Sequence, residues 1–579
     1  MLNLAATRSH NLFHATPIPP RHKRSLPELR TSGSHLLAHS TIPTPERKAE
    51  DDIQHIETIL PQAAHHSQII NEDLVRAENE DKVTPYFIFL ISIAAISGLL
   101  FGYDTAIIGS ALPMVGTNLG HTLSDNEQEI ITAGCTIGAI FGTLILGNLA
   151  DKLGRKWTLA IADFAFTIGA ILLATAFSVP HMIIGRLILG IGVGGASVIG
   201  PLYISELAPT AVRGRCVGVN SFCIPFGQVI ASALGAAFQA GVKPHIAWRC
   251  LFALGVIPSL VQMGLLHWLP ESPRVLILRD DIDAARNVFQ LIYKGASSDI
   301  IDFKLQVCKQ YTDASTQLQR SLTLKQRVSR YWSHKPYRRA IISVSVVQAL
   351  GQLTGFNTLL YYSGTIFGLL GLKNSAAAGL IPSGVVTLFV LIGSSLVDRV
   401  GRRRSLLIGT PLMMVGLTWA CVSFHFLTKD TGGILVAGGE YSRALVGSVL
   451  GALIVFVSGM GYSYGYICWY QSEFLALEIR AAGSSIAVTC CWLANLVISV
   501  AYLTQLKSLG ATGTYGLYLG FISFGLVFVY FCYPETKGLS IDETQSLFED
   551  GFGVKKSQIM LREKQEFASE LRNRIGSSA

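Results

Sequence analysis

An acidic residue, Asp104, lies in the middle of a long apolar segment, and the stretch around it recurs once in the chain. The first copy reads GLLFGYDTAI at residues 98–107, and the second reads GQLTGFNTLL at residues 351–360. An ionisable group at the centre of a bilayer costs about 2.5–3.5 kcal/mol on insertion scales, so we expect Asp104 to line a pathway rather than to face lipid. Two related segments around a polar centre predict a transporter built from two halves.

The chemistry of Asp104 has two interpretations. Three nearby glycines, Gly98, Gly102 and Gly109, allow a helix break at which the carboxylate would accept backbone hydrogen bonds. Alternatively, the carboxylate carries a proton, because a nearby cation favours its charged form and loss of that cation favours protonation. Arg186, in the fourth apolar segment, is the candidate cation. A carboxylate that alternates between paired and unpaired states would load and release a proton.

The other polar side chains in the apolar segments are mainly amides, hydroxyls and aromatic rings. Amides both donate and accept hydrogen bonds, which suits a neutral polyhydroxylated ligand. Indole and phenol rings suit the C–H face of such a ligand, whereas an anionic substrate would require more Arg or Lys. A single amide can equally join two membrane helices. The candidates are Gln228, Gln348, Gln352, Asn357, Tyr361, Tyr362, Trp469, Trp492 and Asn495.

Charged residues recur at the ends of the apolar segments. DKLGRK at 151–156 returns as DRVGRRR at 398–404, and a Glu precedes an Arg by seven residues in each half. An exposed ion pair contributes only about 0–1 kcal/mol, so orientation and solubility are one interpretation. The symmetric placement favours a gate that links the halves in one state and separates in the other. Its members are Asp151 with Arg155, Asp398 with Arg402, Glu206 with Arg213, and Glu473 with Arg480.

The elements that position these residues must be membrane helices. Half of the residues are hydrophobic and 15% are charged, against about 25% charged in a soluble protein, and the mean hydropathy is +0.43. Apolar runs of roughly 20 residues span a bilayer as helices. The sequence therefore predicts an all-α membrane protein with twelve transmembrane helices in two pseudo-symmetric six-helix halves.

The distribution of Lys and Arg predicts the orientation. Both are frequent in loops of one parity, such as 150–156 and 398–404, and absent from 110–128. Loops rich in positive charge stay in the cytoplasm, and an even number of spans places both tails there, in a protein of the plasma membrane. The expected regions are a disordered cytoplasmic tail (1–85), an N-terminal bundle (86–269), a cytoplasmic helical linker (270–337), a C-terminal bundle (338–533) and a cytoplasmic tail (534–579).

Other functional classes are disfavoured. The net charge of +8 arises mostly from loops and tails, which set membrane orientation and do not indicate nucleic-acid binding. The ten cysteines are scattered without a CxxC pair, so we expect no zinc site and interpret them as small core residues. GxGxG at 190–194 lies within an apolar helix and lacks the strand that a dinucleotide fold requires. We expect no enzyme activity, no metal and no cofactor.

At this level of detail the chain resembles the sugar porter family of the major facilitator superfamily, over about residues 84–550. Within that family it is most similar to the fungal proton-coupled myo-inositol transporters, on the character of 361–377, 423–427 and 532–557. The family strings are GYDT (102–105), GNLADKLGRK (147–156), GRLILGIGVG (185–194), PLYISELAPTAVRGR (201–215), PESPR (270–274), QLTGFN (352–357), DRVGRRR (398–404) and PETKG (534–538).

The resemblance implies a secondary active transporter of a neutral polyol or sugar, namely myo-inositol:proton symport by alternating access. It implies proton coupling by Asp104 and Arg186, and an inner gate formed by the charged loop residues. The implied partners are a small polyol or sugar, a proton and the lipid bilayer, with no nucleic acid, and we expect a monomer. The implied sugar-contacting residues are Gln228, Gln352, Asn357, Trp469 and Trp492.

Four residues depart from the family pattern and keep alternatives open. Gly351 and Cys491 stand where amides are usual, and Cys468 and Ala476 stand where prolines are usual. Since Pro disrupts a helix, its loss predicts a stiffer tenth span. The substrate stays open among inositols, hexoses and pentitols. Related facilitators also keep the aspartate, so a hexose or pentose facilitator is one alternative, and a transport-dead nutrient sensor with long tails is another.

Overall fold

The computed structural model describes residues 84–577 apart from 210–211, 294–295, 322–323, 373, 437–438, 440, 477–478 and 540. The predicted disordered tail, 1–85, lies almost wholly outside the described residues. The chain divides into two units, Met1–Gln54 and His55–Ala579. All described residues belong to the second unit.

The first six spans form the N-terminal half. Polar caps start several of these helices: Thr84 Oγ1 accepts a hydrogen bond from Phe87 N, and Ser124 and Glu127 form a capping box. The spans are α3 (Pro85–Val115), α4 (Asp125–Leu153), α5 (Arg155–Ala174), α6 (Val179–Leu207), α7 (Arg213–Gly241), and the sixth, which comprises α8 (Pro244–Leu254), α9 (Val256–Leu265) and η1 (Leu266–Trp268).

The C-terminal half repeats this arrangement after a helical linker. The linker holds α10 (Pro273–Leu278), α11 (Ile282–Ile292), α12 (Ser298–Ser321) and α13 (Leu324–Ser333). The half itself holds α14 (Lys335–Leu353), α15 (Phe356–Tyr361), α16 (Ser363–Leu369), α17 (Ser375–Ala378), α18 (Leu380–Val400), α19 (Arg402–Leu427), η2 (Lys429–Thr431), α20 (Arg443–Tyr462), α21 (Tyr464–Ile467), η3 (Cys468–Glu473), α22 (Arg480–Ser508) and α23 (Gly510–Cys532). The helices α24 (Ile541–Ser546) and α25 (Val554–Ser577) come after the last span.

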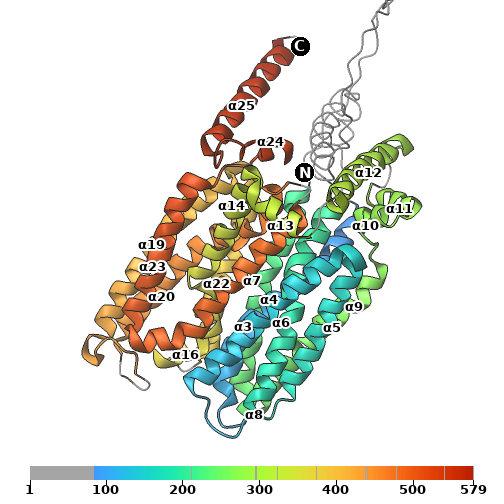
Figure 1. The fold of residues 1–579 in the computed structure, drawn as a ribbon. Helices are drawn as coiled ribbons and strands as arrows, with labels where there is room; N and C mark the ends of the chain where they lie inside the picture. The colour runs from blue at the N-terminus through green and yellow to red at the C-terminus, as the bar shows by residue number, and fades with distance from the viewer. Residues whose placement is uncertain are drawn as a thin grey trace, which may run out of the picture. The chain divides into compact units, whose positions relative to one another are not determined.

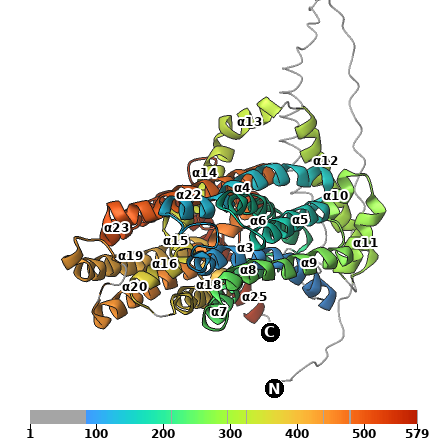
Figure 2. The same cartoon turned by 90° about the horizontal axis from the view of Figure 1, so that it is seen from below.

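Twelve helical segments among the described residues are long and apolar enough to cross a membrane. The prediction of an all-α protein with twelve spans is therefore confirmed. In Figure 1 the blue-to-green helices of the first half run beside the yellow-to-red helices of the second, and Figure 2 shows the same helices nearly end-on. The halves meet chiefly where α4 packs against α22 and α7 packs against α18.

Two spans of the C-terminal half are broken near their middle. Between α14 and α15, Gly355 adopts the left-handed region at φ 80°, where an added Cβ would collide with the ring of Tyr518. After α20, Ser463 is non-helical (φ −125°, ψ −93°), and the chain continues as α21 and then as the 3₁₀ helix η3. The tenth span is thus broken even with Cys468 in place of Pro, and the greater stiffness of this broken part stays a prediction. Non-helical backbone at membrane depth is tolerated where protein buries it.

The α3–α7 contact depends on a glycine. A Cβ built on Gly102 would lie only 1.8 Å from the carbonyl oxygen of Ile224, which is backbone and cannot rotate away. The two helices can therefore approach this closely only because position 102 has no side chain, as is common between membrane helices.

We expect Gly102→Ala to lower the stability of the folded protein by about 1–3 kcal/mol, because the new methyl group forces α3 and α7 apart. Thermal unfolding in detergent measures this loss. The matched control is Gly447→Ala on α20, where an added Cβ meets nothing within 4 Å, so its unfolding temperature should not fall. Equal unfolding temperatures for the two variants would contradict the close contact.

Candidate functional site

The centre of the N-terminal half holds a buried ion pair between α3 and α6. Arg186 Nη1 contacts Asp104 Oδ1, and both residues are almost fully buried, at 1% and 3% exposure. The second carboxylate oxygen, Oδ2, accepts a hydrogen bond from the Cys135 thiol on α4 at 3.0 Å. The structure thus brings the two predicted proton-coupling residues together, with a thiol as the third member. Burying two charges is costly, and their mutual attraction offsets that cost only with good geometry.

A network of amide side chains lies in the C-terminal half, facing the N-terminal half. Gln352 Oε1 accepts hydrogen bonds from Asn357 Nδ2 and, at 2.8 Å, from Asn495 Nδ2. The other end of Asn495 is held too, because its Oδ1 accepts from Tyr361 Oη at 3.2 Å and from Thr136 Oγ1 at 3.1 Å. Thr136 belongs to α4, so this network crosses between the halves. Amides held in this way offer both donors and acceptors to a polyhydroxylated ligand.

Three aromatic rings meet where the halves face each other. Phe101 of α3 lies between Trp469 and Trp492, with ring centroids 6.0 and 5.2 Å away. The indole N–H of Trp492 points to Ser197 Oγ at 3.4 Å, across to α6. Both tryptophans are buried. Faces of this kind pack against the C–H surface of a sugar or polyol ring.

Gln228, the remaining predicted contact residue, lies on α7 in the N-terminal half. It is 4% exposed, and its Oε1 has no hydrogen-bond partner among the described residues. The adjacent Gly227 packs against the backbone of Leu99 and Tyr103, so this turn of α7 lies beside the turn of α3 that precedes Asp104. A buried amide oxygen without a partner is an acceptor available to a ligand hydroxyl.

At one end of the helices, charged residues tie each half to itself. In the N-terminal half, Arg155 binds Asp151 at 2.8 Å and binds both oxygens of Glu206, at 2.9 and 3.0 Å. Ser272 Oγ donates to the same Glu206 carboxylate. Glu271 accepts from the backbone N–H groups of Arg155 and Ser272 at 2.8 and 2.9 Å. A carboxylate at a helix start satisfies N–H groups that the helix itself leaves open.

The C-terminal half carries the same cluster. Arg402 binds Asp398 at 3.0 Å and both oxygens of Glu473 at 2.8 and 3.1 Å. Thr536 Oγ1 donates to Glu473, and Glu535 accepts from the backbone N–H of Arg402 at 2.8 Å. The repeat predicted from sequence is thus also a repeat of contacts. Glu206 is bound by Arg155 and Glu473 by Arg402, and the pairing of Glu206 with Arg213 and of Glu473 with Arg480 stays a prediction.

We call the helix ends that carry Arg155 and Arg402 the ionic end, and those that carry Asp125 and Lys507 the opposite end. At the ionic end, Tyr470 Oη donates to Gly214 O across the halves at 3.1 Å. At the opposite end, Lys507 contacts Asp125, and Glu129 accepts from Thr504 N and Oγ1 at 2.9 and 3.0 Å. The halves therefore touch at both ends of the helices.

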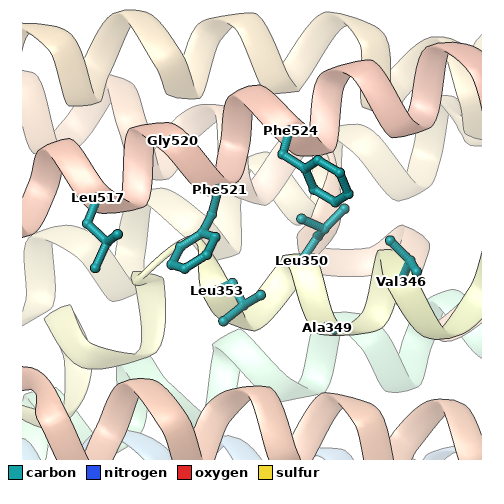
Figure 3. Close-up of a pocket in the computed structure, with 8 residues that line it drawn as sticks. All are labelled: Val346, Ala349, Leu350, Leu353, Leu517, Gly520, Phe521 and Phe524. Atoms are coloured by element: carbon teal, nitrogen blue, oxygen red, sulfur yellow. The ribbon is translucent and has the colours of Figure 1, made fainter.

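An apolar groove of about 590 Å³ lies elsewhere, between α14 and α23. Figure 3 shows side chains of the two helices pointing toward each other across it. The groove offers a polyol no hydrogen-bonding side chain, so it is not the candidate site. Its lining residues are Val346, Ala349, Leu350, Leu353, Leu517, Gly520, Phe521 and Phe524.

Sequence reasoning missed Cys135, Thr136, Phe101 and Tyr470. Cysteine, threonine and phenylalanine in apolar segments are ordinary helix-packing residues, so composition alone does not single them out. The interpretation of the cysteines as small core residues does not cover Cys135, whose thiol binds a carboxylate. Helical spacing was the one available signal. Cys135 and Thr136 are adjacent on one span, so their side chains point about 100° apart around the helix and must face two different neighbouring helices.

The close contact between α4 and α22 near the ionic end predicts that two cysteines introduced there would form a disulfide between the halves. An added Cβ at Gly147 of α4 would lie 3.8 Å from Ser485 Cβ of α22, within the about 3.5–4.5 Å range of disulfides. We expect Gly147→Cys with Ser485→Cys to cross-link under mild oxidation. With a protease site inserted between α11 and α12, the two fragments should stay joined on a non-reducing gel. Each single variant controls for the native cysteines, and fragments that separate would contradict the closed contact.

Comparison with known proteins agrees with this geometry. The family model described as "Sugar (and other) transporter" matches residues 90–548. "Myo-inositol transporter 2" of Cryptococcus neoformans var. grubii is 68% identical over 90% of this chain and 94% of its own length. "Myo-inositol transporter 1" of Saccharomyces cerevisiae is 36% identical over 84% of this chain and 83% of its own.

Solved structures show the same fold. The proton:xylose symporter XylE of the major facilitator superfamily, bound to 6-bromo-6-deoxy-D-glucose, matches with a TM-score of 0.66 and 26% identity, over 80% of this chain and 99% of that one. The family match spans most of the chain, and the twelve spans agree with it. The chain therefore belongs to the sugar (and other) transporter family of the major facilitator superfamily, and it is a multi-pass membrane transporter rather than an enzyme.

Proposed function

We propose that this transporter carries myo-inositol together with a proton by alternating access. Its relatives at 68% and 36% identity are named as myo-inositol transporters, and the similar solved structure is a proton:xylose symporter. The observation that carries the proposal is the buried Asp104–Arg186 pair beside the amide network of Gln352 and Asn495. Proton and polyol would then bind a few side chains apart, near the membrane midplane, where transporter sites of this kind lie.

The groups at hand suit both ligands. When Asp104 binds the proton, its ion pair with Arg186 is lost, because a neutral acid no longer attracts the guanidinium. The amides of Gln228, Gln352 and Asn357 would bind hydroxyls, and Trp469 and Trp492 would pack on the ring. One charge moving inward gains about 2.3 kcal/mol per 100 mV, and one pH unit adds about 1.4 kcal/mol. Together they sustain a several-hundred-fold polyol gradient.

The ionic clusters support a gate between rigid halves. Their ion pairs hold helices of one half together, while Tyr470 joins the halves through Gly214. We propose that opening separates this contact and leaves each cluster intact. We also propose that the ionic end faces the cytoplasm with both tails, that the protein resides in the plasma membrane and acts as a monomer, and that residues 270–337 form a cytoplasmic linker.

Reconstituted protein provides the direct test. Labelled myo-inositol should accumulate in proteoliposomes under an acid-outside gradient, with glucose and xylose as weaker competitors. A protonophore should abolish accumulation, because it removes the driving force. Equilibration without accumulation would favour the hexose or pentose facilitator. Ligand binding without any uptake would favour the nutrient sensor.

We expect Asp104→Asn to abolish accumulation while sparing exchange of labelled for unlabelled substrate, because the amide cannot take up a proton. Counterflow in proteoliposomes separates these two activities. The matched control is Asp163→Asn on α5, another membrane carboxylate, which is 1% exposed and has no hydrogen-bond partner among the described residues. The control should accumulate substrate normally. Full accumulation by Asp104→Asn would refute the assigned role.

A further inference from the structure

We propose that two adjacent residues of α4, Cys135 and Thr136, couple the proton site to the substrate site. This inference rests on the proposed symport. Cys135 contacts the proton-binding carboxylate, and Thr136 contacts the amide that holds the substrate-binding glutamine. Neither residue touches the ligand in this scheme, so both are positioning residues.

The first contact belongs to the proton site. The thiol of Cys135 donates to Asp104 Oδ2 at 3.0 Å, on the carboxylate oxygen that Arg186 Nη1 does not contact. Among the described residues, the titratable and charged groups that interact with Asp104 are Arg186 from α6, Cys135 from α4, Tyr361 from α15 and its chain neighbour Tyr103. A thiol can donate to a carboxylate but gains little from a neutral acid. Protonation of Asp104 therefore weakens the hold on Cys135.

The second contact belongs to the substrate site. Thr136 Oγ1 donates to Asn495 Oδ1 at 3.1 Å, and both side chains are almost completely buried. Because its oxygen is held, Asn495 directs its amide N–H toward Gln352 Oε1 at 2.8 Å. Loss of the Thr136 hydroxyl would leave Tyr361 as the remaining donor to Asn495 Oδ1. The orientation of Gln352 thus depends on the position of α4 relative to α22.

The turn of α4 that carries Cys135 and Thr136 packs closely against α6. An added Cβ at Gly190 would lie 2.1 Å from the carbonyl oxygen of Cys135, and one at Gly138 would lie 2.1 Å from that of Leu187. The helices therefore touch backbone to backbone at Leu187 and Gly190, on the turn of α6 that follows Arg186. Cys135 cannot shift without Thr136, since they are neighbours on one helical turn. A proton bound at Asp104 is thereby sensed at Asn495, in the opposite half.

Coupling requires reciprocity: the proton must change substrate affinity by the same factor by which substrate changes proton affinity. In the native protein we expect KM for myo-inositol to fall at least about fivefold from neutral to acidic external pH, the lower bound for typical coupling. Thr136→Val removes the hydroxyl and keeps the shape. It should raise KM and reduce the pH dependence of KM to less than about twofold, whereas Thr136→Ser should retain it.

The matched control is Thr143→Val, two turns further along α4. Its hydroxyl donates to Gly194 O at 3.2 Å, within the N-terminal half, and the residue is fully buried. This variant should keep the pH dependence of KM. Thr136→Ala repeats the measurement if the valine variant is not recovered from the membrane. Binding titrations that follow the fluorescence of Trp469 and Trp492 provide the same ratio for variants that bind without transporting.

Substitutions at Cys135 provide an independent test of the proposal. Cys135→Ala removes a donor from the carboxylate and should move the pH of half-maximal uptake upward by about 0.5–1 unit, whereas Cys135→Ser, which keeps a donor, should not move it upward. A Thr136→Val protein that keeps the native pH dependence of KM would overturn the coupling while leaving symport standing. A native protein whose KM ignores pH, and which does not accumulate substrate, would overturn both.

Discussion

The structure depends on keeping one carboxylate charged in the middle of a membrane protein. Asp104 is almost completely enclosed by helices, which makes its charge costly, and two contacts offset that cost: a guanidinium on one oxygen and a thiol donor on the other. A lone charge there would cost several kcal/mol, and removing either member of a buried pair leaves the other uncompensated. The Gly102 contact, which brings α7 against α3 beside this carboxylate, serves the same requirement.

The two ends of the halves solve a different problem. A rocking mechanism needs each bundle to move as one body, and bidentate Arg–Glu pairs within a bundle supply such stiffness better than single-point contacts do. Arg155 and Arg402 are both buried while they bind their glutamates. At the ionic end, a contact between the bundles is of another kind: the single hydrogen bond from Tyr470 to Gly214, which contributes about 0.5–1.5 kcal/mol. Strong ion pairs within each bundle and a weaker contact between the bundles at this end favour motion of each bundle as a rigid body.

Sequence alone predicted much of this arrangement, for physical reasons. Membrane spans are long and apolar, so their number follows from hydropathy, and a charge at membrane depth singles out Asp104 and Arg186. Repeated strings predicted the clusters around Arg155 and Arg402, but not which glutamate each arginine binds, because that depends on the crossing of separate helices. The break after α20 survives the loss of Pro at Cys468, since tertiary packing decides it. The role of Thr136 follows only when its partner Asn495 is placed, because helical spacing shows that it faces a different neighbour from Cys135 but not which one.

The anchoring of the segment after α23 has a mechanical consequence. Glu535 caps the start of α19, and Arg339 Nη1 of α14 donates to the carbonyl oxygens of Phe548 and Glu549 at 2.7 and 2.6 Å. Arg339 and Gln352 lie on the same unbroken helix. The segment that leads to α25 is thus mechanically linked to the candidate site. A displacement of residues 548–549 would act on Arg339, and through the continuous helix α14 on the side chain of Gln352.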